Sequence, residues 1–302
     1  MNSRANSWSG HLAAAGAYAI FGFNIIFCKD IAQSGAVSPI VLFTLRAIGA
    51  TALFWALSLS LPKERVSGRE LLRIALASFL GLFVPQLTFL AAIGMTTSID
   101  AAVLSSLTPV YTMCFAFLFL GEPITGKKVT GVAVSLLGVL LLIFNSVHDT
   151  GGPDRTRPLG VLLMALNGLS FAGYLGAFRP LISRHGVVTL MKWMFLFALL
   201  LSLPFSWGGL MRLDPTAVTP QVGWEIAFVI VFATFVAYFL IPLGQKRLRP
   251  TLVSMYSYLQ PMIAAGVSIA IGMDAFTWQK ALAALLVFGG VALVSRSRAA
   301  SA

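Results

Sequence analysis

One stretch of sequence occurs twice in this chain and decides its fold. It reads SSLTPVYTMCFAFLFLGEPITGKK over residues 105–128 and SYLQPMIAAGVSIAIGMDAFTWQK over residues 257–280. At an offset of 152, the matched positions are Ser105/Ser257, Leu107/Leu259, Pro109/Pro261, Glu122/Asp274, Thr125/Thr277 and Lys128/Lys280. At an offset of 150, earlier matches are Gly10/Gly160, Phe21/Phe171 and Lys29/Arg179. Polar and proline matches at a nearly constant offset are uncommon between unrelated apolar helices, so the chain contains an internal repeat.

The composition around this repeat is that of a membrane protein. Of 302 residues, 58% are apolar and 10% are charged, whereas a soluble domain has about 25% charged residues. The mean hydropathy is +0.89. This excludes disordered, collagen-like, disulfide-scaffold and nucleic-acid-binding classes. Because a spanning helix needs roughly 20 apolar residues, we predict an all-α polytopic fold with ten transmembrane helices at 11–28, 39–61, 71–93, 99–120, 128–145, 159–178, 187–207, 222–243, 251–271 and 278–295.

Basic residues are distributed unevenly over the two sides of these spans. Of the 21 Lys and Arg residues, 15 lie on the side of the N-terminus and five on the other side, while Arg46 lies inside the second span. Lys and Arg accumulate in cytoplasmic loops. Both termini are therefore predicted to be cytoplasmic, which also explains the net charge of +11 without a nucleic-acid partner.

The repeat divides the chain into two domains of five spans each, 1–148 and 157–302, joined by a turn-rich connecting loop at 149–156. Since five is odd, the second copy must enter the membrane inverted. Inverted repeats are an architecture of secondary transporters, which bind substrate near the midplane between the halves. The repeat thus favours a transporter.

The quoted motifs resemble the EamA domain of the drug/metabolite transporter (DMT) superfamily, over nearly the whole chain. Within it, the sequence is most similar to the YddG-type exporters of aromatic and other amino acids, although Met273 and Ala275 replace the Gly and Pro of the first copy. The resemblance implies two inverted five-helix repeats, with spans 1–4 and 6–9 around a central cavity and spans 5 and 10 outside it. It also implies an exporter of neutral amino acids, multi-pass in the bacterial inner membrane, that works by alternating access without a cofactor or metal.

Polar residues inside the membrane are expensive and are candidates for function. Two pairs related by the repeat, Gln86 with Tyr238 and Asn24 with Tyr174, suit the amino and carboxylate groups of a zwitterion. Hydrogen bonds between helices are the alternative explanation. Further candidate substrate-binding residues lie beside the helix-breaking prolines: Tyr111, Tyr256 and Ser257.

Four prolines are candidate hinges for gating: Pro85, Pro109, Pro242 and Pro261. Ordinary structural kinks are an equal alternative. Arg46 could bind a substrate carboxylate, or its side chain could snorkel to the outer surface. We assign all ten carboxylates to loops or span ends, which favours a facilitator over a proton antiporter. Cys28 and Cys114 are expected to be buried free thiols.

Other classes remain as alternatives. An exporter of other small metabolites, nucleotide sugars or cationic drugs is the main one. An intramembrane enzyme is disfavoured because the three histidines lie at span ends or in loops, and a structural bundle is disfavoured by the repeat. We expect a monomer bound only to lipid and small substrates. A dimer is the alternative, through Gly131, Gly138, Gly289 and Gly290, which otherwise pack within one chain.

Overall fold

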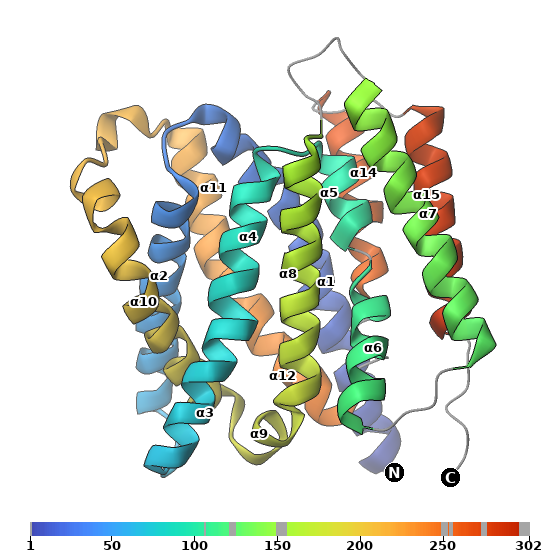
Figure 1. Ribbon diagram of the computed structural model, residues 1–302. Coiled ribbons are helices and arrows are strands. Elements are labelled where there is room, and N and C mark those ends of the chain that lie inside the picture. The colour runs from blue at the N-terminus through green and yellow to red at the C-terminus, as the bar shows by residue number, and fades with distance from the viewer. Residues whose placement is uncertain are drawn as a thin grey trace.

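The regular structure of the described residues is helical, and Figure 1 shows the helices side by side in one bundle. The computed structural model describes residues 2–105, 107–120, 125–148, 156–248, 253, 256–272 and 277–295. The first half contains α1 (Asn2–Ser34), α2 (Pro39–Leu59), α3 (Gly68–Ser78), α4 (Val84–Ile93), α5 (Ser98–Ser105), α6 (Thr108–Leu120) and α7 (Gly126–His148). The second half contains α8 (Pro158–Ala177), α9 (Arg179–Arg184), α10 (Val187–Met211), α11 (Pro220–Ile230), α12 (Ala237–Arg247), α14 (Leu259–Ala270) and α15 (Trp278–Ser295).

Six helical stretches are long and apolar enough to cross a membrane: Trp8–Ser34, Pro39–Leu59, Gly68–Ile93, Pro158–Ala177, Val187–Met211 and Pro220–Arg247. Two shorter apolar stretches are Val129–Gly138 and Ala281–Gly290. The bundle also exposes large apolar side chains such as Leu72, Phe205 and Leu285, which suits a surface that faces lipid. Ten spans and cytoplasmic termini stay predictions.

The helix contacts follow the repeat. α1 packs against α12 and α14, and the equivalent helix α8 packs against α4 and α6. α2 packs against its counterpart α10, and α7 against its counterpart α15. α1 and α8 run in opposite directions along the bundle (Figure 1). The two halves are therefore interleaved and related by an approximate two-fold axis.

Two glycines show the symmetry between the halves in their individual contacts. A Cβ at Gly10 would collide with Arg247 and Leu248, and one at Gly160 would collide with Met95 and Thr96. The two sites are equivalent under the repeat, since 95 and 96 correspond to 247 and 248 at an offset of 152. A side chain at either glycine would push the helices apart.

α7 and α15 pack closely enough to need glycine on both sides. A Cβ at Gly138 would overlap the Ala283 carbonyl, and one at Gly290 would overlap the Gly131 carbonyl. The Ser135 Oγ donates to the Val287 carbonyl at 3.3 Å. Small residues allow this close approach in membranes. These three glycines therefore pack within the chain, as the intramolecular alternative expects.

Cys28 is buried as a free thiol, whereas Cys114 is free but exposed. The prediction of burial is therefore wrong for Cys114. Hydropathy alone does not distinguish a lipid-facing position on an apolar helix from a core position.

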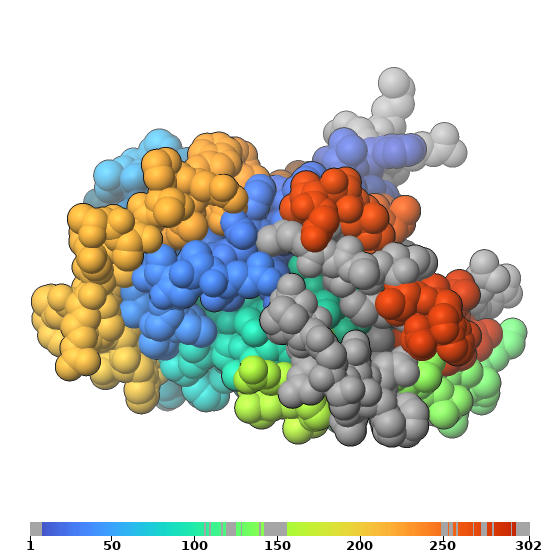
Figure 2. Space-filling model, turned by 90° about the horizontal axis from the view of Figure 1, so that it is seen from above, coloured from blue at the N-terminus to red at the C-terminus, as the bar shows by residue number. Residues whose placement is uncertain are grey.

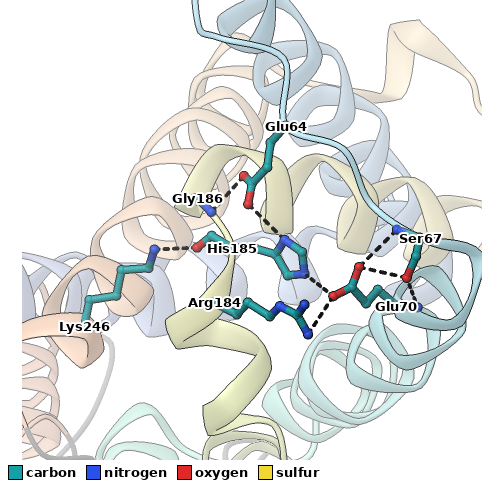
Figure 3. A network of polar contacts seen from close by, with 7 residues as sticks. All are labelled: Glu64, Ser67, Glu70, Arg184, His185, Gly186 and Lys246. Carbon is teal, nitrogen blue, oxygen red and sulfur yellow. Dashed lines mark hydrogen bonds and ion pairs between the residues drawn. The ribbon is translucent and has the colours of Figure 1, made fainter.

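A group of polar residues joins the two halves at the end of the bundle where α1 begins (Figures 1 and 3). We call it the inter-repeat clamp, and its members are Glu64, Ser67, Glu70, Arg184, His185, Gly186 and Lys246. The buried His185 ring places Nδ1 3.0 Å from Glu64 Oε1 and Nε2 3.5 Å from Glu70 Oε1. Arg184 pairs with Glu70 at 3.1 Å. The loop and helix after α2 are thereby held to the α9–α10 junction of the other half.

Glu64 also closes the start of α10. Its Oε2 accepts the Gly186 N–H at 2.9 Å, where the positive end of the helix favours an anion. Burial acts to raise the pKa of Glu64, but the bonds from Gly186, Thr189 and His185 outweigh it and hold that pKa below its usual value. Glu64 is thus ionised at neutral pH and strengthens the clamp.

The clamp predicts a pH-dependent effect of Glu64→Gln. A carboxyl whose folded pKa is lowered stabilises the fold above its unfolded pKa, and this contribution is lost as the pH falls through the folded value. We expect Glu64→Gln to lower the free energy of unfolding by about 1–2 kcal/mol at pH 7. The difference from wild type should disappear as the pH falls below 4.5, the ordinary value for the group. Urea unfolding in micelles measures this free energy, and Arg65→Gln is the exposed control. A difference between Glu64→Gln and wild type that does not change with pH would contradict the assignment of Glu64 as an ionised member of the clamp.

The α7–α15 contact predicts that neighbouring glycines respond differently to the same change. Gly290→Ala should lower the free energy of unfolding by about 1–3 kcal/mol, because the added methyl group meets the backbone of α7. Gly289→Ala should have little effect, since a Cβ at Gly289 meets open space. Thermal unfolding of both variants in the same detergent compares them. Equal midpoints would show that the contact is looser than described.

Candidate functional site

A cavity of about 80 Å³ lies among α1, α2, α4, α8 and α12, the α5–α6 junction and the start of α14. Its polar lining comes from both halves of the chain: Asn24, Arg46, Gln86, Ser105, Thr108, Asn167, Tyr238 and Gln260. Its less polar lining is mainly aromatic: Tyr18, Phe21, Ile25, Pro85, Phe89 and Phe171. Most ligand pockets are mainly apolar with a few placed polar groups, and this cavity has that character.

Two π-helical turns come directly before the cavity-lining helices α4 and α12, and the repeat relates them. One spans Phe79–Phe83 between α3 and α4, and the other spans Val231–Val236 between α11 and α12. They begin 152 residues apart, the same offset as the sequence repeat. Turns of this kind are rare and frequently occur at functional sites. The sequence gives a partial signal in Pro85, whose missing N–H frees a carbonyl one turn earlier.

Side chains from the opposite half hydrogen-bond to the carbonyls of the first turn and the residues after it. Asn167 Nδ2 donates to the Pro85 carbonyl at 2.7 Å, and Ser170 Oγ donates to the Leu80 carbonyl at 2.7 Å. In the second turn, Thr234 Oγ1 donates to the Val229 carbonyl at 2.7 Å. Backbone groups in lipid need such partners. The contacts that satisfy the turns also place Asn167 in the cavity wall.

The predicted hinge prolines have different positions. Pro85 lines the cavity at the start of α4. Pro109 and Pro261 are the second and third residues of α6 and α14, where a missing N–H removes no intrahelical bond. They therefore begin second helix segments beside the cavity instead of kinking continuous helices. Pro242 is buried within α12 and is not part of the lining.

Arg46 points into the bundle, so the snorkelling interpretation is wrong. The residue is 2% exposed, and its Nε donates to Thr234 Oγ1 at 2.8 Å. Its Nη1 is buried without a hydrogen-bond partner. Within the described ranges no carboxylate forms an ion pair with it. A buried cation with an unused donor is costly, and it faces the cavity where an anionic group could meet it.

Gln86 and Tyr238, the repeat-related pair, both line the cavity. Tyr238 neighbours Arg46 and Gln86 and packs edge-on against Phe21 and Phe195, with ring centroids 5.7 and 5.6 Å away. The Gln86 amide has no hydrogen bond of normal geometry on either its oxygen or its nitrogen. Since a buried amide without partners costs free energy, a bound molecule would relieve it.

The second repeat-related pair is not used symmetrically. Asn24 lines the cavity, and its Oδ1 accepts from Cys28 Sγ at 3.4 Å. Tyr174 is buried away from the lining, where its ring packs on Gly81 and its hydroxyl points to Met194 Sδ at 3.7 Å. Tyr174 therefore supports the first π turn from behind.

The remaining predicted substrate-binding residues also lie outside the lining. Tyr111 packs on Gly168, and Tyr256 Oη lies 2.7 Å from His11 Nδ1. Ser257 is fully buried, and its Oγ has no partner. Helix ends lie close to both tyrosines, so a helical wheel drawn for an unbroken span does not give the direction of their side chains. Sequence reasoning omitted Asn167 and Gln260, although Gln260 corresponds to Thr108 at the 152 offset.

Comparisons with known proteins agree with this architecture. The pattern of the EamA-like transporter family matches residues 8–144 and again residues 158–296. The "uncharacterized transporter YetK" of Bacillus subtilis is 21% identical over 93% of this chain and 85% of its own length. The "uncharacterized inner membrane transporter YedA" of Escherichia coli is 25% identical over 85% of this chain and 81% of its own.

A solved crystal structure shares the fold. It has a TM-score of 0.61 and 20% identity, covering 92% of this chain and 94% of that chain. The two family matches fall on the two interleaved halves whose helices surround the cavity. The chain belongs to the EamA-like transporter family.

Proposed function

We propose that this membrane transporter exports amino acids with aromatic or other bulky neutral side chains, and that Arg46 binds their carboxylate. The observation that carries the proposal is the free, buried Nη1 of Arg46 in an aromatic-lined cavity. Guanidinium groups bind carboxylates with strong, directional hydrogen bonds. The guanidinium would thus neutralise the substrate carboxylate, and that carboxylate would give Arg46 the negatively charged partner it lacks.

The other lining groups suit the rest of such a substrate. The oxygens of Gln86 and Asn24 can accept from an ammonium group, and both side chains line the same cavity as Arg46. Phe21, Phe89 and Phe171 present apolar rings to a bulky side chain. The helices α6 and α14 begin beside the cavity, and helix N-termini favour anions.

The alternatives fit the lining less well. A cationic drug would meet the positive charge of Arg46. A nucleotide sugar carries several phosphate charges, while Arg46 alone among the lining residues of the described cavity is basic. Phosphates are usually held by more than one cationic side chain. A single carboxylate is therefore the anion that this site matches best.

The halves provide a route to alternating access. The helices around the cavity include π turns in both halves, next to α4 and α12, and helix segments that begin beside the cavity. These are positions where a helix can bend. We place the protein in the bacterial inner membrane with both termini in the cytoplasm, working without a cofactor and as a monomer. Rocking of one half against the other would then expose the cavity to each side in turn.

Replacing Arg46 tests the carboxylate site. Arg46→Gln should weaken binding of L-phenylalanine by about 1.5–3 kcal/mol, the usual range for a hydrogen bond to a charged group. This equals a loss of roughly 10- to 150-fold in affinity. Arg46→Lys should be intermediate, because it keeps the charge and loses the planar fork. Transport of labelled L-phenylalanine into proteoliposomes measures the effect, together with a thermal unfolding curve for each variant.

Two controls accompany this experiment. Lys192→Gln removes a cation that lies 5.0 Å over the Trp55 ring, outside the cavity, and should leave the affinity unchanged. Phenethylamine, which lacks the carboxylate, should not compete with phenylalanine in wild type. Equal affinity in Arg46→Gln and wild type would remove Arg46 from the site.

Replacing Gln86 separates binding from helix packing. Because neither amide atom is paired, Gln86→Ala should leave stability nearly unchanged and weaken substrate binding by about 1–3 kcal/mol, roughly 5- to 100-fold. Tyr238→Phe should act in the same direction. Gln245→Ala is the matched control, since that amide is also buried and unpaired but does not line the cavity. A similar loss of affinity in Gln245→Ala would show that the effect is indirect.

A further inference from the structure

Two carboxyl groups from opposite halves meet where α1 packs against α11, near the end of the bundle opposite the inter-repeat clamp. Gln221 Nε2 donates to Asp30 Oδ2 at 3.0 Å and to Glu225 Oε1 at 3.3 Å. Glu225 is 4% exposed, and its Oε2 is buried without a partner. The sequence places Glu225 at a span end, but the structure encloses it.

The surroundings do not supply a cation for this pair. Neither Asp30 nor Glu225 forms an ion pair within the described part of the chain. Asp30 on α1 and Gln221 on α11 are the polar neighbours of Glu225, and Cys28 on α1 lies between Glu225 and Arg46 of α2 in its electrostatic surroundings. Arg46 is directed to Thr234, nine residues further along the helix and thus roughly 13 Å deeper. Lys29 sends its Nζ to the Thr96 carbonyl.

Two adjacent carboxyl groups can attract each other only if one of them holds a proton. Ionised carboxylates only accept hydrogen bonds, so Asp30 and Glu225 cannot bond to each other in that form, and like charges disfavour joint ionisation. One added proton makes the Glu225 carboxyl neutral and turns it into a donor to Asp30. The buried Oε2 then takes part in the hydrogen bond to Asp30, and the contact between α1 and α11 becomes attractive.

We propose that Asp30, Gln221 and Glu225 form a proton-binding site that holds α1 against α11. Loss of the proton breaks the O–H bond of the Glu225 carboxyl, leaves the electron pair on its oxygen, and passes the proton to water. The resulting pair of carboxylates repels, and α1 separates from α11. Asp30 is partly exposed and Gln221 is exposed, so they connect the buried Glu225 to water at this end.

The position of α1 links this site to the transport route. One face of α1 lines the central cavity at Asn24 and a second cavity of about 270 Å³ at Cys28, Ile31 and Ala32. The second cavity lies toward the end at which α1 ends, and Figure 2 looks onto that end, with the blue α1–α2 region beside the orange α11. Asp30 leaves the same helix toward α11. A shift of α1 at the carboxyl pair would therefore move the wall of the second cavity, so this end should close in acid and open in alkali.

Thiol labelling tests the site without any transport substrate, so its outcome is independent of the proposed amino-acid cargo. Ala32→Cys is introduced into a Cys28→Ala, Cys114→Ala background and labelled with a membrane-impermeant maleimide over a range of pH. The labelling rate is divided by that of the same protein carrying Glu225→Gln, which cancels the titration of the thiol itself. We expect this ratio to rise on the order of tenfold from acidic to alkaline pH. A tenfold change is what results when closing this end changes the pKa of the bound proton by about one unit.

Further variants make the test decisive. Asp30→Asn should abolish the pH dependence as Glu225→Gln does, which protects the conclusion if one variant folds poorly. Asp214→Asn, which changes an exposed carboxylate on the α10–α11 connection, should retain it. Infrared difference spectra of the purified protein should show a protonated carboxyl signal at neutral pH that Glu225→Gln removes. A flat labelling ratio, or an infrared signal unaffected by Glu225→Gln, would overturn the proposal.

Discussion

The hydrogen bonds that cross between the halves at the two π turns organise this protein. A π turn leaves helical carbonyls without their usual partners, and the bilayer provides no water to replace them. Asn167 and Ser170 of α8 serve the first turn and the adjoining Pro85, while Arg46 of α2 bonds to Thr234 in the second. The second half therefore completes the backbone of the first turn, the first half holds the Thr234 side chain of the second turn, and Asn167 and Arg46 also line the cavity.

This arrangement explains why an arginine is tolerated at the centre of the bundle. The Nε of Arg46 is held by Thr234, which fixes the plane of the guanidinium and directs an unused donor toward the cavity. A fixed, partly satisfied cation needs little reorganisation when an anion arrives. In the proposed function, the free energy lost by burying the charge in the empty state would become available on binding, and the site would select substrates that carry a carboxylate.

The two ends of the bundle join the halves by opposite electrostatic means. The inter-repeat clamp sets Glu64 and Glu70 around His185, so the negative charge of Glu64 strengthens it. The opposite end brings Asp30 and Glu225 together across Gln221, so negative charge there weakens the contact unless a proton is present. In our proposal, loss of a proton from Glu225 would open that end, whereas loss of a proton from Glu64 would strengthen the clamp at the other end.

The repeat could be predicted from the sequence because polar and proline matches at one offset stand out in apolar helices. The depth of Gln86, Tyr238 and Asn24 within their spans predicted that these residues line the cavity. It could not give the direction of Arg46 or of Tyr174, because rotation of a membrane helix is set by its neighbours. Asn167 had no polar counterpart in the first half, where position 17 is alanine. Glu225 looked peripheral, since distance along the chain does not show that α1 covers it.

The central claim is that the substrate carboxylate meets Arg46, and a solid-state NMR distance addresses it most directly. The protein is labelled with ¹⁵N in its arginine guanidinium groups, reconstituted in lipid, and saturated with L-phenylalanine carrying ¹³C at the carboxyl carbon. Direct hydrogen bonding predicts dipolar coupling that corresponds to a carbon–nitrogen distance of about 4 Å, which is lost in Arg46→Lys protein. Bound phenylalanine without such coupling in the wild-type protein would contradict the account.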